Sequence, residues 1–336
     1  MNLQALSKIA TELVAPRKGI LAADESSGTI KKRFDSIGVD STETNRRNYR
    51  ELLFTTNNVS QFISGIILYD ETMRQQGNDG VSLVKTITNN GMIPGIKVDK
   101  GAKPLAGSRT ETVTEGLDGL RERLDEYREL GAKFTKWRGV IEIGDSIPTQ
   151  YCINTNAHAL ARFAALSQEA GLVPIVEPEV LMDGTHDIDT CMQVTKTTLR
   201  EVYYELGCQN VALEGTLLKP NMVLSGKNAD NRASAEQVAE KTLACLMNTV
   251  PSSVPGIVFL SGGQSDEEAT INLNSINKAA KSAAAPWQLS FSYGRGLQAS
   301  PLKEWSGIEG NSKAAQDSFY QRAEVTSAAR EGTYSA

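Results

Sequence analysis

The chain of 336 residues is predicted to form an α/β fold in which eight parallel strands close into one barrel covered by helices. Short apolar runs alternate with helix-like segments along the whole chain, there are eight such runs, and the runs do not alternate polar with apolar residues. Continuous apolar runs are typical of strands buried on both faces, and eight βα units favour a closed barrel over an open sheet. Because no linker or strong internal repeat interrupts the pattern, residues 1–336 are expected to form a single (β/α)8, or TIM barrel, domain.

The expected strands are the apolar runs themselves. In chain order they are 19–23, 63–68, 93–98, 134–138, 173–177, 210–214, 257–260 and 288–291. A short C-terminal helix and tail are expected over about 312–336.

Helices are indicated by leucine and alanine residues that recur at helical spacing between these runs. In 117–130 four leucines and Tyr127 recur every three or four residues, and Gly131 follows as a C-terminal cap. Two other periodic segments end at Gly171 and Gly207. Two helix starts have the spacing of a capping box: Ser234 with Gln237, and Ser265 with Glu268.

Composition argues against several classes of protein. The net charge is −5 and there is no polybasic run, so neither nucleic acid nor an anionic membrane surface is an expected partner. No apolar stretch approaches the ~20 residues of a spanning helix and the first residues do not resemble a signal peptide, which favours a soluble, cytoplasmic protein. The four cysteines and two histidines lack metal-ligand spacing, so no metal or other cofactor is expected.

Polar side chains follow nearly every expected strand. In a barrel of this kind the carboxyl ends of the strands carry the chemistry. Polar residues could simply resume where strands end, but three lysines and several carboxylates converging on one mouth would be costly unless paired. The strand ends carry Asp24, Lys97 with Asp99, Lys136 with Arg138, Glu177 with Glu179, Lys219, Ser261 with Gly262 and Gly263, and Gly294 with Arg295.

Two anion sites are expected at this mouth. The glycines after the seventh and eighth runs expose backbone N–H groups, and Arg295 supplies a bidentate fork suited to phosphate. A second site is expected from Ser26, Thr29 and Arg33 together with Lys97. Either glycine-rich segment could also be an ordinary tight turn. Two anion sites flanking one amine indicate a bisphosphate substrate.

Cleavage of a carbon–carbon bond beside a carbonyl needs an electron sink, either a divalent metal or a protonated imine. With no histidine cluster, an imine on Lys219 is favoured, and nearby Lys136 supplies a repelling positive charge. Glu177 could transfer protons during imine formation, and Asp24 could accept the proton of the hydroxyl beside the breaking bond.

Seven motifs resemble the class I, Schiff-base-forming fructose-1,6-bisphosphate aldolases, over nearly the whole chain. The longest is Leu213-Glu-Gly-Thr-Leu-Leu-Lys-Pro-Asn221, and the others are 20–26, 95–101, 136–138, 174–179, 260–265 and 291–295. The resemblance implies a TIM barrel that splits fructose 1,6-bisphosphate into dihydroxyacetone phosphate and glyceraldehyde 3-phosphate in glycolysis and gluconeogenesis, without a metal. It also implies a homo-oligomer, with a tetramer as the expected form.

Carried over by motif, Lys219 is the Schiff-base lysine, Glu177 its proton-transfer partner, Asp24 the cleavage base and Lys136 an electrostatic group, while Glu179 orients this network. The resemblance assigns the ketose-side phosphate to Ser261, Gly262, Gly294 and Arg295, and the other end of the substrate to Ser26, Thr29, Arg33 and Lys97. Three further residues are expected to bind the substrate or its phosphates: Arg138, Gly263 and Ser292.

The chain departs from the animal pattern of this family in two places. Thr29 stands where that pattern has serine, which keeps the hydroxyl. Animal members carry a longer tail that ends in a tyrosine assisting proton exchange, and Tyr334 does not align with it. Another group, or water, is then expected to handle that proton, with slower or less selective turnover.

Two other functions remain open from the residues alone. A phosphosugar isomerase or synthase would use Lys219 only as a cation for phosphate. A non-catalytic scaffold would not need the lysine for any reaction.

Overall fold

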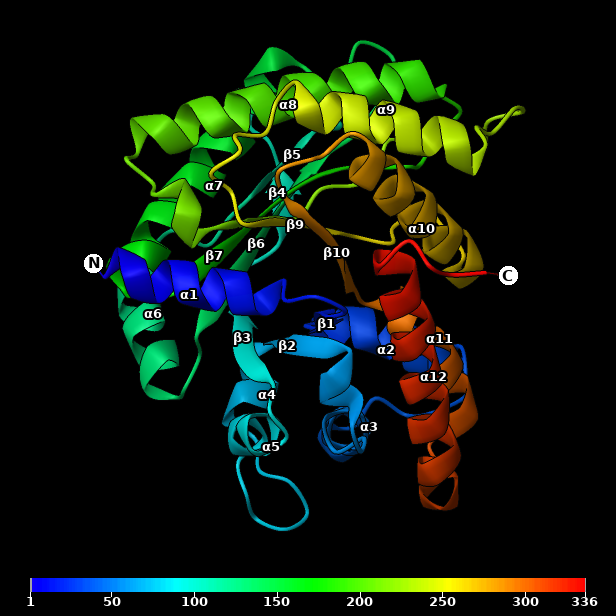
Figure 1. The fold of residues 1–336 in the computed structure, drawn as a ribbon. Coiled ribbons are helices and arrows are strands. Elements are labelled where there is room, and N and C mark those ends of the chain that lie inside the picture. Colours follow the sequence, from blue (N-terminus) through cyan, green and yellow to red (C-terminus); the bar gives the residue numbers. More distant parts are fainter. Residues whose placement is uncertain (1, 336) are drawn as a thin grey trace.

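The computed structural model describes residues 2–335, and its main sheet is a closed barrel of eight parallel strands (Figure 1). Neighbouring strands follow chain order, and the last pairs with the first through Ile20 and Ser292. The predicted α/β barrel is therefore confirmed. The strands are β1 (Gly19–Ala23), β2 (Ile63–Leu68), β3 (Ile93–Lys97), β6 (Phe134–Ile141), β7 (Val173–Val180), β8 (Leu217–Leu218), β9 (Gly256–Phe259) and β10 (Gln288–Tyr293).

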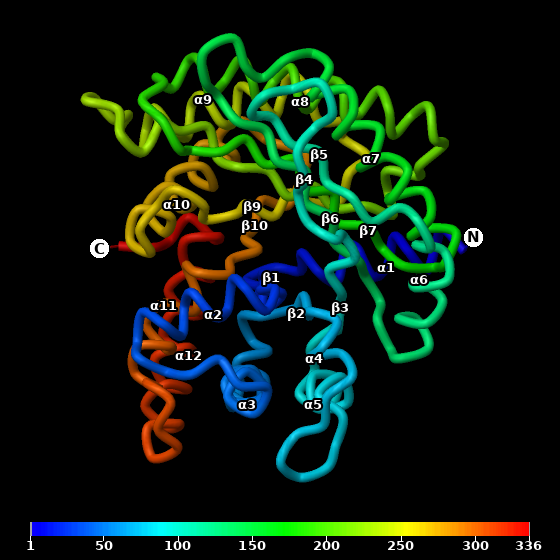
Figure 2. Tube along the Cα trace, turned by 180° about the vertical axis from the view of Figure 1, so that it is seen from behind, coloured from blue at the N-terminus to red at the C-terminus, as the bar shows by residue number. Residues whose placement is uncertain are grey.

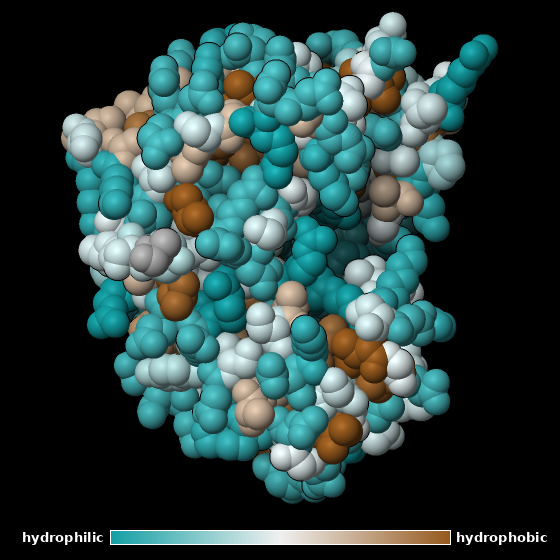
Figure 3. Space-filling model, turned by 90° about the vertical axis from the view of Figure 1, so that its right-hand side faces the viewer, coloured by the Kyte–Doolittle hydropathy of each residue, from teal (hydrophilic) through white to brown (hydrophobic). Residues whose placement is uncertain are grey.

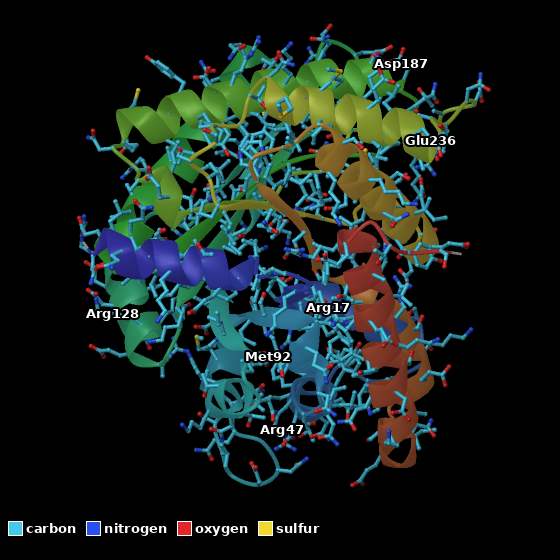
Figure 4. The ribbon with its side chains drawn as sticks, viewed as in Figure 1. Arg17, Arg47, Met92, Arg128, Asp187 and Glu236 are labelled. Atoms are coloured by element: carbon cyan, nitrogen blue, oxygen red, sulfur yellow. The ribbon has the colours of Figure 1, made fainter. Side chains whose placement is uncertain are left out.

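Helices surround the barrel. They are α1 (Leu3–Leu13), α2 (Ser27–Asp35), α3 (Glu43–Phe54), α4 (Asp70–Arg74), α5 (Leu83–Asn89), α6 (Leu120–Glu129), α7 (Gln150–Glu169), α8 (Ile188–Cys208), α9 (Ala235–Met247), α10 (Asp266–Ser282), α11 (Arg295–Trp305) and α12 (Ser312–Arg330). Both predicted capping boxes are present, at the starts of α9 and α10. Asp187 caps α8, and Figure 4 labels it together with Glu236 in the first turn of α9. Within residues 2–335, none of these helices meets both the length and the apolarity that crossing a bilayer requires.

The sixth strand lies further along the chain than predicted. Residues 213–215 form a 3-10 turn, η2 (Leu213–Gly215), and β8 follows it, so the prediction of a strand over 210–214 is wrong. The side chain of Gln168 bonds Ala212 N (3.0 Å), Ala212 O (2.7 Å) and Gly215 O (3.2 Å), satisfying backbone groups that a strand would have paired. Lys219 therefore comes directly after its strand.

A small antiparallel hairpin was not predicted. It consists of β4 (Ala102–Pro104) and β5 (Thr112–Thr114) and lies beside β6, as the view from behind shows (Figure 2). Thr114 Oγ1 donates to Arg138 O at 2.6 Å and Asn156 Nδ2 donates to Thr112 O at 2.9 Å. Each strand has three residues and β4 is exposed along its whole length, so the hairpin gives no apolar signal in the sequence.

Helix α1 covers the amino-terminal end of the barrel, and in Figure 1 it runs from the left towards the middle of the view. Its residues Leu6, Ala10 and Leu13 share one buried cluster with barrel-interior side chains such as Phe134 and Ile175. Burying these leucines inside the barrel end stabilises the fold by roughly 1.5–3 kcal/mol each. The second, larger cluster fills the layer between the strands and the outer helices.

Helix α12 brings the end of the chain back to the amino-terminal side of the barrel. Ser327 Oγ donates to the carbonyl of Arg17 at 2.6 Å. Arg17, which Figure 4 labels, lies in the loop between α1 and β1. Arg330 donates to Val14 O at 2.8 Å. The backbone N–H of Tyr334 donates to Asn274 Oδ1 of α10 at 3.0 Å. The residues after α12 are thus tied to α10.

Candidate active site

The carboxyl ends of the barrel strands open into a cavity of about 1910 Å³. A hollow with hydrophilic walls is visible right of centre in Figure 3. Every residue assigned to the site from the sequence lines this cavity: Asp24, Ser26, Thr29, Arg33, Lys97, Lys136, Arg138, Glu177, Glu179, Lys219, Ser261, Gly262, Gly263, Ser292, Gly294 and Arg295. The structure therefore brings all of them to one mouth.

The period-two alternation of the strands explains this convergence. On β6, Phe134 points into the barrel, so Lys136, two residues later, points inward nearer the mouth. On β7, Ile175 and Glu177 have the same relation, and Lys219 follows the inward-facing Leu217 of β8 in the same way. Each of these three strands thus places an apolar side chain at the bottom of the barrel and a charged side chain at its mouth.

Four charged groups alternate in sign across the centre of the mouth. Lys219 Nζ lies 3.0 Å from Glu177 Oε1, and the other oxygen of that carboxylate lies 3.1 Å from Lys136 Nζ. Lys136 Nζ in turn lies 2.7 Å from Asp24 Oδ2. Lys219, Glu177 and Lys136 are 4%, 3% and 3% exposed. Because two positive groups face two negative groups, their mutual attraction offsets part of the free energy that is lost when they leave water.

These contacts fix the charge states. Burial alone would raise the pKa of Asp24, but the positive charges of Lys136 and Lys219 outweigh it and hold that pKa well below its usual value. The pKa of Glu177 is lowered for the same reason. Burial disfavours the charged form of Lys136, yet Asp24 and Glu177 raise its pKa well above that of free lysine. Both carboxylates are therefore ionised and Lys136 is protonated at neutral pH.

One side of the mouth is built from small residues after β9 and β10. Gly263 has φ +76°, and a Cβ on it would lie 2.4 Å from Met182 Cβ, so only glycine fits this turn. A Cβ on Gly262 would lie 2.9 Å from Glu179 Oε1, and one on Gly296 would lie 3.1 Å from Ser261 Oγ. The two loops therefore approach closely, and α11 presents its first N–H groups to the cavity beside Gly294.

Most cations at the mouth already have a carboxylate partner. Lys97 Nζ lies 2.6 Å from Asp99 Oδ1, and Arg138 Nε bonds Glu179 Oε2. Arg295 differs, because within residues 2–335 its recorded hydrogen bond is Nη2 to the carbonyl of Gln264 at 3.3 Å. Among the cations assigned to the site from the sequence, Arg295 is therefore the one without a carboxylate partner within residues 2–335.

Arg33 lies close to the loop after β10. Its Nη2 would be 3.5 Å from a Cβ on Gly294. Its Nη1 makes an ion pair with Glu25, which sequence reasoning did not assign to the site. Glu25 lies inside the motif 20–26, next to Asp24, and only its buried contacts distinguish it from other polar residues there.

Among residues 2–335, no group of three or more His, Cys, Asp or Glu side chains is arranged to hold a metal ion.

Comparison with known proteins gives a consistent family. The model of the family described as "Glycolytic: Fructose-bisphosphate aldolase class-I" matches residues 5–336. A "Probable fructose-bisphosphate aldolase class 1" of Xanthomonas campestris pv. campestris is 56% identical over 335 residues, covering 99% of each chain. "Fructose-bisphosphate aldolase 4, cytosolic" of Arabidopsis thaliana is 53% identical over 319 residues, which are 95% of this chain and 81% of that protein.

Among solved structures, a fructose-bisphosphate aldolase from Plasmodium falciparum, crystallised with TRAP and a small-molecule inhibitor, superimposes with a TM-score of 0.96. It is 48% identical to this chain, and the alignment covers 99% of this chain and 96% of that one.

Proposed function

The chain belongs to the class I fructose-bisphosphate aldolases, which are lyases of glycolysis, and we propose that it cleaves fructose 1,6-bisphosphate reversibly through an imine on Lys219. The products are dihydroxyacetone phosphate and glyceraldehyde 3-phosphate. The observation that supports the proposal most is the position of Lys219. Its amine is buried at the centre of a cavity with cations on several sides and lies 3.0 Å from a carboxylate that can accept its proton.

Imine formation begins when the neutral amine of Lys219 attacks the ketose carbonyl. Glu177 accepts a proton from the amine and returns it to the departing hydroxyl, because its Oε1 already contacts Lys219 Nζ. Lys136 stays protonated against the other oxygen of the same carboxylate, because Asp24 and Glu177 raise its pKa.

Asp24 then accepts the proton of the hydroxyl on the carbon that becomes the aldehyde. The carbon–carbon bond breaks and its electron pair moves into the protonated imine, leaving an enamine on Lys219. Protonation of the enamine carbon and hydrolysis of the resulting imine release dihydroxyacetone phosphate and restore the lysine. Because the pKa of Asp24 is lowered, the carboxylate is ready as a base at neutral pH.

The ketose-side phosphate is assigned to Arg295 and the loops carrying Ser261 and Gly294. Ser292 Oγ lines the cavity and is buried with no hydrogen-bond partner within residues 2–335, so it is free to bind an incoming oxygen. The other end of the substrate is assigned to Ser26, Thr29, Arg33 and Lys97, and Arg138 is assigned to substrate binding as well. Glu179 orients Arg138 and supports the loop at Gly262.

Trapping with borohydride tests the imine. Incubation with dihydroxyacetone phosphate and borohydride should add one reduced triose phosphate to the chain, on the peptide that contains Lys219. Lys219→Ala should lose both the adduct and cleavage, while Lys103→Ala, an exposed lysine of the β4–β5 hairpin, should keep both. An isomerase or synthase would give no adduct, a scaffold would give neither adduct nor cleavage, and loss of activity with a chelator would indicate a metal as electron sink.

We further propose that residues 1–336 act as one cytoplasmic domain that forms a homo-oligomer, with a tetramer as the proposed assembly. Closure of the barrel between β1 and β10 and the return of α12 to the β1 side support one domain. Relatives named cytosolic in Arabidopsis support the location. Sedimentation of the purified chain measures its mass in solution, and a monomer would contradict the proposed assembly.

A further inference from the structure

Asn221 is a buried amide that no step of the proposed mechanism uses. It lies two residues after Lys219, is 2% exposed, and does not belong to the cavity wall in the part of the chain that the structure describes. Its Oδ1 accepts a hydrogen bond of 3.0 Å from the backbone N–H of Val180. Its Nδ2 donates to Thr195 Oγ1 at 3.1 Å and to Met222 O at 3.0 Å. The amide therefore uses its oxygen and both of its N–H groups.

The bond to Val180 replaces a part of the barrel ladder that the main chain does not supply. Strand β8 ends at Leu218, and within residues 2–335 the last main-chain bond of its ladder with β7 runs from Lys219 N to Val176 O at 2.8 Å. Strand β7 continues to Val180, whose N–H is buried and needs an acceptor. The side-chain oxygen of Asn221 is that acceptor, so it extends the pairing of the two strands towards the mouth.

The two bonds lie on either side of the contact on which the proposed chemistry depends. Lys219 Nζ lies 3.0 Å from Glu177 Oε1. Along β7, Glu177 comes between Val176 and Val180, so one bond holds the strands on the barrel side of this contact and the other on the mouth side. Because the amine and the carboxylate belong to different strands, their separation depends on how firmly those strands are held together.

Helix α8 holds the amide of Asn221 from outside the barrel. Thr195 lies in α8, is 3% exposed, and accepts one of the two amide N–H groups. Met222 O accepts the other. With both N–H groups engaged, the oxygen atom is directed at Val180 N.

We infer that Asn221 is a positioning residue for imine formation. By completing the β7–β8 ladder at the mouth, it keeps the amine of Lys219 within reach of Glu177. This inference rests on the proposed function. It concerns the rate at which the imine forms and not the affinity for the substrate, because Asn221 lies behind the cavity wall.

Asn221→Leu removes the acceptor and keeps a similar side-chain volume. Single-turnover trapping with dihydroxyacetone phosphate and borohydride measures the rate of imine formation. That rate should fall by about 10–100-fold, because a displacement of about 1 Å between reacting groups is enough for such a loss. An unchanged rate in the folded variant would overturn the inference.

A hexitol 1,6-bisphosphate separates positioning from binding. It carries two phosphates but no carbonyl, so it enters the cavity without forming an imine. Its Kd in Asn221→Leu should stay within about twofold of the parent value. A Kd that rises by the same factor as the imine rate falls would show that Asn221 acts on substrate binding, which contradicts the inference.

Asn277→Leu is the matched control. Asn277 is another buried amide, 6% exposed, and its Nδ2 donates within α10 to Leu273 O at 3.0 Å. This variant should lose stability but form the imine at the parental rate, because α10 lies outside the β7–β8 pair. An equal loss of rate in Asn277→Leu and Asn221→Leu would be a general effect of destabilisation and would refute the positioning role.

Thr195→Val is the milder variant if Asn221→Leu does not fold. It removes one partner of the amide and lets the amide turn away from Val180, so imine formation should slow by about threefold with an unchanged Kd for the hexitol bisphosphate. A parental rate in Thr195→Val would then decide against the inference.

The parent protein shows which proposal has failed. Absence of the borohydride adduct in the parent contradicts the proposed function itself. Normal trapping in the parent, together with a parental rate in Asn221→Leu, contradicts only the role of Asn221.

Discussion

Lys136→Met is the substitution whose effect the charge arrangement predicts most sharply. It removes the cation that lies 2.7 Å from Asp24 Oδ2 and 3.1 Å from Glu177 Oε2, while keeping most of the side-chain volume. At an effective dielectric constant near 20, each contact of about 3 Å represents roughly 5 kcal/mol of attraction, an upper bound because neighbouring groups relax. In the variant both carboxylates stay buried, but they lose the positive charge that offsets the cost of their burial.

The sign of the pH effect follows directly. The cation lowers the pKa of both carboxylates, so its removal raises both pKa values. One carboxylate then becomes protonated at a higher pH than in the parent protein. The acid limb of kcat/KM should therefore move upward by about 1 pH unit or more. At the optimum, kcat should fall by about 10²–10⁴-fold, as for loss of a group that assists proton transfer.

Steady-state cleavage of fructose 1,6-bisphosphate, followed across pH 5–9, measures both effects. Protonation of the substrate phosphates, with a pKa of about 6, is common to all variants and cancels in the comparison. Lys136→Arg keeps the positive charge and is the matched control, with an acid limb close to that of the parent. An unchanged acid limb in Lys136→Met, in a variant that melts as a folded protein, would refute the argument that this cation sets the two carboxylates.

Three further substitutions test the packing. Gly262→Ala places a Cβ 2.9 Å from Glu179 Oε1 and should raise KM for fructose 1,6-bisphosphate about tenfold with a smaller change in kcat, measured in the same assay; an unaltered KM would show that the loop can shift. Leu13 is 0% exposed in the amino-terminal end of the barrel, so Leu13→Ala should lower the free energy of unfolding by about 2–5 kcal/mol, measured by urea titration. A loss below about 1 kcal/mol would argue that Leu13 contributes little to the packing of the barrel end. Gly207→Ala, in α8 with no atom within 4 Å of the new Cβ, should raise the free energy of unfolding by about 0.5–1 kcal/mol and leave cleavage unchanged; destabilisation would contradict this.

The strands were predictable where the apolar signal was continuous. Seven of the expected runs overlap observed barrel strands, because residues buried on both faces need an unbroken apolar sequence. The prediction of the sixth strand was wrong because β8 spans only Leu217–Leu218. In the predicted range, the backbone of Ala212 bonds the side chain of Gln168 instead of a neighbouring strand. Such a contact crosses 44 residues and leaves no local pattern.

The amino-acid sequence by itself determined the fold class, the family and the order of side chains along each strand. Alternation with period two then placed apolar residues such as Phe134 at the bottom of the barrel and charged ones such as Lys136 at the mouth. Only the tertiary structure decided which charge faces which. It paired Lys219 and Lys136 with the same carboxylate of Glu177 and paired Arg33 with Glu25. The physical reason is that strand pattern is a local property, whereas partners across the mouth depend on how separate loops pack after the barrel closes.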